Sequence, residues 1–597
     1  MHKNFAHFRA TGLLALLAIA AGASARALPP VPQPAENPTT EAKRVLGKIL
    51  FWDEQLSSDN TMACGTCHRA AFGGGDPRVA IHPGLDGIQP SPDDRFTSPG
   101  VVHCDTNENY DPAANFDLNV QVTPRAANPF INAGYAPELF WDGRASSTFT
   151  DPQTGLIEIV AGGALESQVV GPPTSTVEMG HDDRNWDQIS EKLRTAGPLA
   201  LATNLPADVD AAILSFPSYP LLFAQAFGDN EINAKRIAFA VAAYERTLIS
   251  DQSPWDLFVA GDTGALTPGQ QQGLAFFQAS ACNICHNAPL FTDNQFHNIG
   301  LRPNNDDIAR EEVTGNPADR GKTKTASLRN LATRATLMHT GQFNNVGQVF
   351  PFYAGPGAPG NPNRDPLLPA VIPPPQAPAV IDFIVNGLTD PRVVAETFPF
   401  DRPTLRSELG PNPVIITAST PGTGGIAPRL IANVPPNVGN TNFKIGLDNA
   451  LGGAIATVVI SQTPPVAGQL INLIDTQGPF TIQSTGAGNG YATFHWPIAP
   501  NAALDGETYF MQWLVADAGA TGGIARSNIA QLTLFAGAAL PPGCPGDADA
   551  SGAVDLADLT VVLFNFGSAG PDGDVDLDGD VDLDDLSTVL FWFGSAC

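Results

Sequence analysis

Long hydrophobic runs and basic residues are both scarce in this chain of 597 residues. After the first 27 residues, no stretch approaches the roughly 18 consecutive apolar residues that a transmembrane helix needs. Lysine and arginine number 31 against 60 aspartates and glutamates, which gives a formal charge of -29. This balance argues against nucleic acid or anionic lipid as partners and favours small basic proteins.

The first residues have the features of an export signal. Lys3 and Arg9 precede the apolar run 12–21, and small residues follow up to position 27. We expect residues 1–27 to be a signal peptide, too short to span a bilayer. The mature protein is then expected in the periplasm or outside the cell, where disulfides can form.

Cysteine is also rare, and four of the seven cysteines stand in two copies of the pattern Cys-x-x-Cys-His. Two thiols at this spacing can each add to a vinyl group of haem, and the next histidine then lies under the ring as an iron ligand. A redox-active or zinc-binding motif is the alternative, but two copies in an exported chain favour two c-type haems. The residues that would hold them are Cys64, Cys67, His68, Cys282, Cys285 and His286.

The composition after the signal predicts a multidomain protein. We expect residues 28–230 and 231–410 to form two mainly α-helical cytochrome c-like domains with long Gly- and Pro-rich loops. The clearest helical patterns cover residues 41–51, 234–248, 267–279 and 379–387.

Between residues 411 and 540, short Val-, Ile- and Thr-rich runs separated by Gly, Pro and Asn predict an all-β sandwich. Nothing in that segment offers paired carboxylates or an activated nucleophile. A structural or adhesive spacer is therefore favoured over a catalytic unit.

The acidic tail, residues 544–597, contains a repeat of 27 residues, 547–558 and 574–585. Each copy matches a twelve-residue calcium loop, with glycine at position 6 for the sharp turn and a helical run after it. The expected calcium ligands are Asp547, Asp549, Ser551, Asp555 and Asp558 in the first loop, and Asp574, Asp576, Asp578, Asp582 and Asp585 in the second. A plain acidic tail would not repeat the loop.

Position 12 of each loop is aspartate rather than glutamate, and the tail therefore resembles a small α-helical dockerin type I module. A cohesin-like partner and simple calcium-dependent stabilisation both remain open. Cys544 and Cys597 bracket the tail and are expected to form a disulfide, which leaves Cys104 as the odd thiol.

The segments around the haem motifs resemble a known family. Residues 139–145 (LFWDGRA), 244–250 (YERTLIS), 291–300 (FTDNQFHNIG) and 326–331 (ASLRNL) are similar to the bacterial di-haem cytochrome c peroxidases, including their MauG branch. The resemblance covers about residues 40–405 and implies two cytochrome c-like helical domains that face each other.

The resemblance also implies roles for residues near the first haem. It places Gln168, Pro172 and Glu178 over that haem, with Glu178 as the catalytic acid/base that moves a proton between the peroxide oxygens. A glutamate that merely starts a helix is the alternative. Residues 147–165 make the segment before it longer than is usual in the family.

Trp141 matches the tryptophan that lies between the haems in the family and can relay an electron, with a buried core tryptophan as the alternative. Tyr353, in the word VFPFYAG, matches the axial tyrosine that the MauG branch has at the second haem. Met338 is the rival ligand. A phenolate should lower the iron potential relative to a thioether.

The sequence leaves two family features undecided: the second ligand of the first haem and a calcium site between the haems. His82 lies where a displaceable ligand of the first haem or a surface loop histidine could stand, and His103 is a weaker candidate. Val122 stands where the family has the asparagine of an inter-haem calcium site, although carbonyls near Thr325 and Ser327 could still contribute.

These inferences lead to one expected function and two alternatives. The expected function is a di-haem peroxidase that reduces H₂O₂ to water with electrons from a small cytochrome or cupredoxin. A MauG-like oxidase that uses haems in high oxidation states to modify a protein or organic molecule is the first alternative; Tyr353 favours it and Ser280, where MauG has a tryptophan, disfavours it. A non-enzymatic electron-transfer cytochrome is the second.

Overall fold

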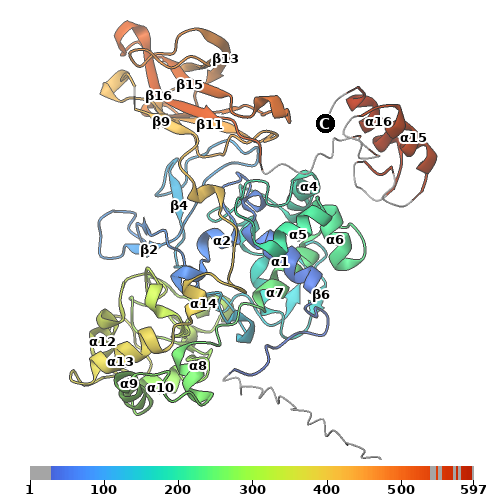
Figure 1. The fold of residues 1–597 in the computed structure, drawn as a ribbon. Coiled ribbons are helices and arrows are strands. Elements are labelled where there is room, and N and C mark those ends of the chain that lie inside the picture. Colours follow the sequence, from blue (N-terminus) through green and yellow to red (C-terminus); the bar gives the residue numbers. More distant parts are fainter. Residues whose placement is uncertain are drawn as a thin grey trace, which may run out of the picture.

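The computed structural model describes residues 28–417 and 419–537 and, in the tail, residues 546, 548, 554–568, 573–575 and 580–594. Along the described chain, two haem-motif halves and a β-rich region follow one another (Figure 1). The expected signal peptide and the cysteines at 544 and 597 lie outside the described residues. No described helix is long and apolar enough to cross a membrane.

The first half is organised by the crossing of α1 (Glu41–Trp52) and α7 (Ala234–Glu245). Thr40 caps α1 by accepting a hydrogen bond from the Lys43 backbone N–H. The two helices approach so closely that a Cβ at Gly47 would lie 1.9 Å from the Ala240 carbonyl oxygen, so only glycine fits. The remaining helices are α2 (Cys64–Cys67), α3 (Ala164–Val169), α4 (Trp186–Thr195), α5 (Ala207–Ser215) and α6 (Tyr219–Phe227).

The second half repeats this arrangement with α9 (Pro268–Gln278) and α13 (Ala377–Asp382), which continues into the π-helical turn Phe383–Gly387. Again a glycine permits the contact, because a Cβ at Gly273 would lie 2.0 Å from the Ala379 carbonyl oxygen. The other helices are α8 (Pro254–Val259), α10 (Cys282–Cys285), α11 (Arg310–Thr314), α12 (Val346–Ala354) and α14 (Pro391–Val394). All four helical patterns expected from the sequence are therefore helices.

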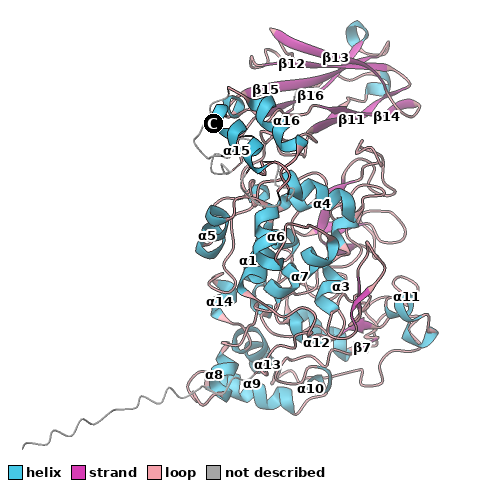
Figure 2. Ribbon diagram, turned by 90° about the vertical axis from the view of Figure 1, so that its right-hand side faces the viewer, coloured by secondary structure: helices cyan, strands magenta, loops and turns pink. Residues whose placement is uncertain are grey.

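The expectation of mainly helical haem domains is only partly right. Much of both halves is loop, and short antiparallel strand pairs hold several of these loops (Figure 2). Such pairs satisfy backbone groups where the chain must run around a cavity rather than through a packed core. They are β1 (Ala80–His82) with β2 (Arg95–Thr97), β3 (Pro99–Val102) with β4 (Val120–Val122), β5 (Phe149–Thr150) with β6 (Ile157–Ile159), and β7 (Phe296–His297) with β8 (Thr323–Lys324).

The expected β-rich region is confirmed. One sheet has the order β10-β11-β14 and the other the order β13-β12-β15-β16-β9, and all pairs within them are antiparallel. Residues of both sheets share one core, in which the Trp513 side chain is fully buried and donates its indole N–H to Gly446 O. The strands are β9 (Val414–Ile416), β10 (Arg429–Ile431), β11 (Lys444–Gly452), β12 (Ile455–Ser461), β13 (Leu473–Thr481), β14 (Gly486–His495), β15 (Thr508–Ala516) and β16 (Ile524–Thr533).

The β-rich region is docked on the first half through the loop that follows β3. Cys104 is buried there, and the Lys444 ammonium donates to its sulfur at 3.4 Å and to the Glu108 carbonyl oxygen at 2.5 Å. The Tyr110 ring packs beside Gly446 of β11. The odd thiol thus belongs to a domain contact.

The described part of the tail contains α15 (Leu556–Asn565) and α16 (Leu583–Trp592). Asp555 and Asp582 begin the helices as N-caps, and Asp558 and Asp585 are fully buried at the third helical position. The small core consists of Val554, Val562, Val581 and Val589, so the 27-residue repeat is also a structural repeat. Asp547, Asp549, Ser551, Asp576 and Asp578 lie outside the described residues.

Loss of the Arg329 guanidinium should destabilise the second half strongly. Arg329 is 2% exposed and forms two 2.8 Å hydrogen bonds with the Asp256 carboxylate of α8. The variant Arg329→Gln leaves that carboxylate buried without its cation, and we expect a loss of about 3–5 kcal/mol in the free energy of unfolding. Urea unfolding of the holoprotein measures it.

The matched control is Arg194→Gln, which removes an exposed 3.5 Å ion pair with Glu191. It should change the free energy of unfolding by less than about 1 kcal/mol. Equal effects of the two substitutions would contradict the structural role of the buried pair.

Candidate functional site

Both Cys-x-x-Cys-His motifs form one helical turn followed directly by the histidine. In the first motif, the Thr66 hydroxyl accepts a hydrogen bond from the Ala63 backbone N–H and fixes the start of α2. The Nδ1 atom of His68 lies 3.4 Å from the carbonyl oxygen of Gly74. This contact assigns the ring proton to Nδ1 and leaves Nε2 free for a metal.

The second motif has the same geometry. His286 Nδ1 lies 3.1 Å from the Phe291 carbonyl oxygen, so Nε2 is again the free nitrogen. Cys282, Cys285 and His286 all line one cavity, which extends to α12. Two thiols and an oriented imidazole at the wall of a cavity are what covalent haem requires, so these residues fit the group.

The three residues expected over the first haem lie together with Trp141 in a separate cavity. Its lining includes His68 and Cys67 of the first motif. The expected site residues in the same lining are Trp141, Gln168, Pro172 and Glu178. Gln168 comes from α3 and Pro172 begins the following 3-10 turn, so one short segment carries both.

Glu178 has the environment of a proton-handling group. Burial raises the pKa of its carboxyl above the usual value, while the nearby Arg144 cation and a hydrogen bond with Ser175 lower it less. The Arg144 guanidinium lies 3.6 Å from the Phe140 ring centroid, and both residues line the cavity. A carboxyl with a raised pKa beside a bound substrate can both accept and return a proton.

Among the described residues that line this cavity, His68 is the only histidine. The His82 Nδ1 accepts a hydrogen bond from the Gly84 N–H, and its ring packs against Phe116. His103 is placed between Asp111 and Asp182. Neither His82 nor His103 is among the residues that line this cavity.

Trp141 lines both cavities. Its indole N–H donates to the Ala126 carbonyl oxygen at 2.8 Å, and its own carbonyl oxygen accepts from the Lys324 N–H of the second half at 2.8 Å. The ring of His339 lies 6.0 Å away, centroid to centroid. These hydrogen bonds hold the indole and the backbone of Trp141 between the two cavities.

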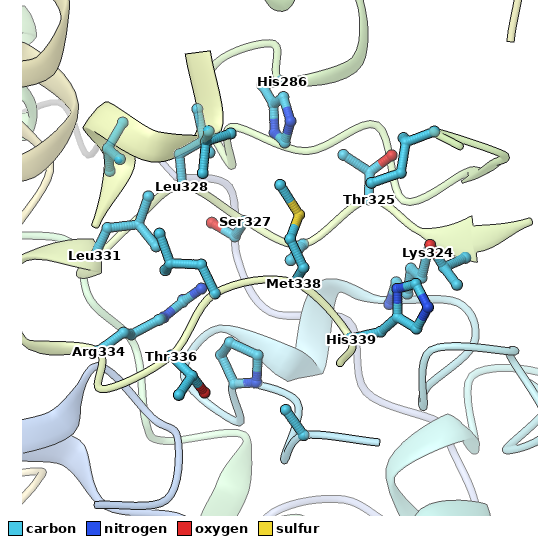
Figure 3. A pocket seen from close by; sticks show the side chains of 18 of the residues that line it. His286, Lys324, Thr325, Ser327, Leu328, Leu331, Arg334, Thr336, Met338 and His339 are labelled. Carbon is cyan, nitrogen blue, oxygen red and sulfur yellow. The ribbon is translucent and has the colours of Figure 1, made fainter. Parts of the chain in front are cut away.

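Both candidate ligands of the second haem line its cavity. Tyr353 projects from α12, and burial beside Cys282 and Cys285 raises the pKa of its phenol well above the usual value. In Figure 3 the thioether of Met338 points toward His286. Ser280 donates its hydroxyl to the Phe277 carbonyl oxygen.

Arginines join the halves beside Trp141. Arg125 pairs with Asp142 of the first half and Asp307 of the second, at 2.5 and 2.6 Å. Arg95 pairs with Asp306 at 3.2 Å. Of the carbonyl groups considered for a calcium site, that of Thr325 accepts the Thr292 hydroxyl.

Within the described residues, one group of three side chains has metal-ligand spacing, namely Cys285, Asp293 and His297. His297 is held by Asp365 at 2.6 Å and Asp293 at 3.0 Å. Hydrogen bonds with Cys285, Asp365 and Asp293 raise the pKa of His297 to about 10. Cys285 belongs to the haem motif, so the group does not form a separate site.

Sequence reasoning gave no role to Glu245, a buried residue of the first cavity. The residue is 4% exposed, its Oε2 atom has no hydrogen-bond partner within the described part of the chain, and burial raises the pKa of its carboxyl to about 8. The residue stands in the segment 244–250 that carries the family resemblance, and this position could have marked it as a candidate site residue.

Known proteins similar to this chain include cytochrome c peroxidases and MauG proteins. A sequence model of the family described as di-haem cytochrome c peroxidase matches residues 41–264. Cytochrome-c peroxidase IdrP1 of Pseudomonas sp. is 29% identical over 446 residues, which cover 68% of this chain and 97% of that protein. Methylamine utilization protein MauG of Methylorubrum extorquens is 31% identical over 329 residues, 54% of this chain and 71% of that protein.

A solved structure of a MauG-like protein associated with microbial copper homeostasis has a TM-score of 0.44 and 24% identity, covering 63% of this chain and 96% of that one. The sequence relationships are the stronger finding, because they extend over most of the length of the relatives. On this basis the chain belongs to the di-haem cytochrome c peroxidase family, oxidoreductases that use two c-type haems.

Proposed function

We propose that this protein is an exported di-haem peroxidase that reduces H₂O₂ to water with electrons from a small redox protein. The observation that carries the proposal is the first cavity, which combines His68, Gln168 and Glu178 and shares Trp141 with the second haem site. A cavity beside the first haem motif that holds a proton-handling carboxyl would suit peroxide, and an indole shared by both cavities would suit electron transfer between the sites.

The residues of the first cavity have distinct tasks. The haems supply the redox chemistry that breaks the peroxide bond. Glu178 accepts the proton of one peroxide oxygen and returns it to the other, which then leaves as water. The Gln168 carboxamide can donate and accept hydrogen bonds. Pro172, which has no N–H, forms part of the wall.

Trp141 is the proposed electron relay between the sites. Its indole N–H is held by a carbonyl oxygen, and its ring faces both cavities. The donor is proposed to be a small basic cytochrome or cupredoxin, because the formal charge of -29 attracts a cation and the association should weaken with salt.

A MauG-like oxidase of a protein or organic substrate is the second candidate. The position of Tyr353 in the second cavity favours it, since an anionic ligand stabilises oxidised iron. Ser280, bonded to the Phe277 carbonyl, offers no oxidisable ring at the position where MauG has a tryptophan. A pure electron carrier is disfavoured because it needs no carboxyl such as Glu178 in the cavity.

The tail is proposed to be a dockerin-like calcium module, tied by a Cys544–Cys597 disulfide, that binds a cohesin-like partner. Support comes from exposed apolar side chains that recur at the 27-residue repeat. Leu556 and Leu583 are 67% and 68% exposed, and Leu563 and Leu590 are 55% and 56% exposed. A protein partner would cover such equivalent surfaces.

Replacing Glu178 by glutamine should slow the reaction with peroxide by about 10²- to 10⁴-fold, because the amide cannot accept the proton. Stopped-flow spectra of the holoprotein mixed with H₂O₂ measure the rate. The base must be ionised and its pKa is raised above 4.5, so the wild-type rate should fall with decreasing pH through a midpoint above 4.5. The control Glu191→Gln changes a side chain that is 76% exposed and should react normally. Undiminished reaction of Glu178→Gln would refute the assignment.

Replacing Tyr353 by methionine should raise the midpoint potential of the second haem, because a thioether favours reduced iron more than a phenolate does. Spectroelectrochemical titration gives the potential. Met338→Leu, at the rival position, should leave the ligand spectrum unchanged. If Met338→Leu alters the spectrum and Tyr353→Met does not, Met338 is the ligand.

Two calcium ions should bind the tail of the full chain, and chelation by EGTA should lower its thermal stability. Isothermal titration calorimetry counts the sites. Asp585→Asn alters a buried expected ligand and should weaken one site, whereas Asp584→Asn, at the exposed neighbour, should leave two. Unchanged calcium binding by Asp585→Asn would contradict the second loop.

A further inference from the structure

Arg334 is a half-buried cation at the boundary between the two haem sites. It follows the segment 326–331 and lines the second cavity. Figure 3 shows its guanidinium directed into that cavity, with Lys324 at the opposite side of the view. Nothing in the proposed peroxide chemistry uses this residue.

Carbonyl groups are the hydrogen-bond partners of Arg334. Its Nε donates to the Gly73 oxygen and one Nη to the Arg329 oxygen, each at 3.1 Å. Among the described residues, no carboxylate lies within ion-pair distance of this guanidinium. Burial lowers its pKa to about 9 with no acidic neighbour to oppose the effect. The neighbouring Arg329, by contrast, is matched by Asp256 at 2.8 Å.

The acids in the wall of the second cavity cannot supply the missing charge. Asp76 is paired with Arg78 at 2.9 Å, and Asp365 with His297 at 2.6 Å. A buried cation is costly unless it is paired. The Arg334 guanidinium would therefore be stabilised by an anionic group on the molecule that occupies the second cavity.

We propose that Arg334 binds a propionate carboxylate of the second haem and links that haem mechanically to the proximal histidine of the first. Haem carries two propionates, and a guanidinium pairs with a carboxylate through parallel N–H donors. The proposal rests on the two haem sites and not on the identity of the oxidised substrate.

The link runs through the loop 69–75, which follows the first haem motif. Gly73, at φ +61°, packs so closely that a Cβ would lie 2.2 Å from the Asn330 carbonyl oxygen and 2.7 Å from Arg334 Cγ. The loop is closed by hydrogen bonds from Arg69 N to Gly75 O and from Gly74 N to Arg69 O. Gly74 O in turn faces His68 Nδ1 at 3.4 Å.

This chain of contacts gives Arg334 a positioning role at the first haem. The hydrogen bond on Nδ1 sets how strongly a histidine binds its metal, so a shift of Gly73 and Gly74 changes the first site. A group that Arg334 binds in the second cavity thereby affects His68, the ligand of the other haem, although that group does not touch His68.

The test uses the full holoprotein without peroxide and three variants. Arg334→Gln should lower the midpoint potential of the second haem, because loss of a nearby cation favours oxidised iron. The same variant should shift the Fe–His stretching band of the reduced first haem in resonance Raman spectra. Arg334→Lys keeps the charge and should restore the second-haem potential but not the first-haem band. Lys324→Gln removes a cation of the same cavity without touching loop 69–75 and should leave that band unchanged.

Other results overturn the proposal. An unchanged second-haem potential in Arg334→Gln, at full haem content, means that Arg334 does not pair with the haem. A lowered potential with an unchanged first-haem band removes the link between the sites. If Lys324→Gln shifts the first-haem band equally, the shift results from the loss of charge in the second cavity and not from the contact between Arg334 and loop 69–75. Equilibrium potentials and Raman bands are independent of peroxidase turnover, so they separate this proposal from the proposed function.

Discussion

The position of Trp141 is the constraint on which the two haem sites depend. The residue lines both cavities. Its indole N–H donates to the Ala126 carbonyl oxygen, and its backbone carbonyl oxygen accepts from the Lys324 N–H. Two haems can exchange electrons through the Trp141 ring only if neither half of the protein moves away from that ring. The buried arginine pairs of Arg95 and Arg125, which join the halves beside this residue, serve that requirement.

Each half meets the same packing problem, because a haem cavity takes the place of much of the core. The chain answers with one tight helix crossing per half, α1 on α7 and α9 on α13, made possible by Gly47 and Gly273. Loops then line the cavities and carry the polar groups. The polar residues of the first site accordingly lie on one short stretch of chain, Gln168 near the end of α3 and Glu178 in the turn that follows the 3-10 turn Pro172–Thr174.

Local pattern was enough to predict some of this structure. The helices α1, α7 and α9 and the β-rich region follow from periodicity, and the haem motifs follow from spacing. The resemblance brought Trp141, Gln168, Pro172 and Glu178 into one site, and the structure places all four in one cavity. Their catalytic roles, and the choice of Tyr353 over Met338, remain predictions.

What the sequence could not reveal depends on contacts between distant segments. Arg334 is informative only because Gly73 lies against it and none of the described acidic residues pairs with it. Glu245 is informative only because its carboxyl is buried at a cavity wall. The fraction of helix was overestimated for the same reason, since loop segments paired by short strands have no periodic signal. Cys104 likewise shows its place only in contact with Lys444.

In the proposed reaction, the first cavity reduces peroxide with electrons received from outside the protein. The most direct measurement mixes the full-length holoprotein with H₂O₂ and a reduced small c-type cytochrome and counts oxidised cytochrome per peroxide consumed. We expect rapid turnover with two cytochromes oxidised for each H₂O₂. Consumption of peroxide without oxidation of the cytochrome, or of a reduced cupredoxin in its place, would contradict it and favour an oxidase acting on another substrate.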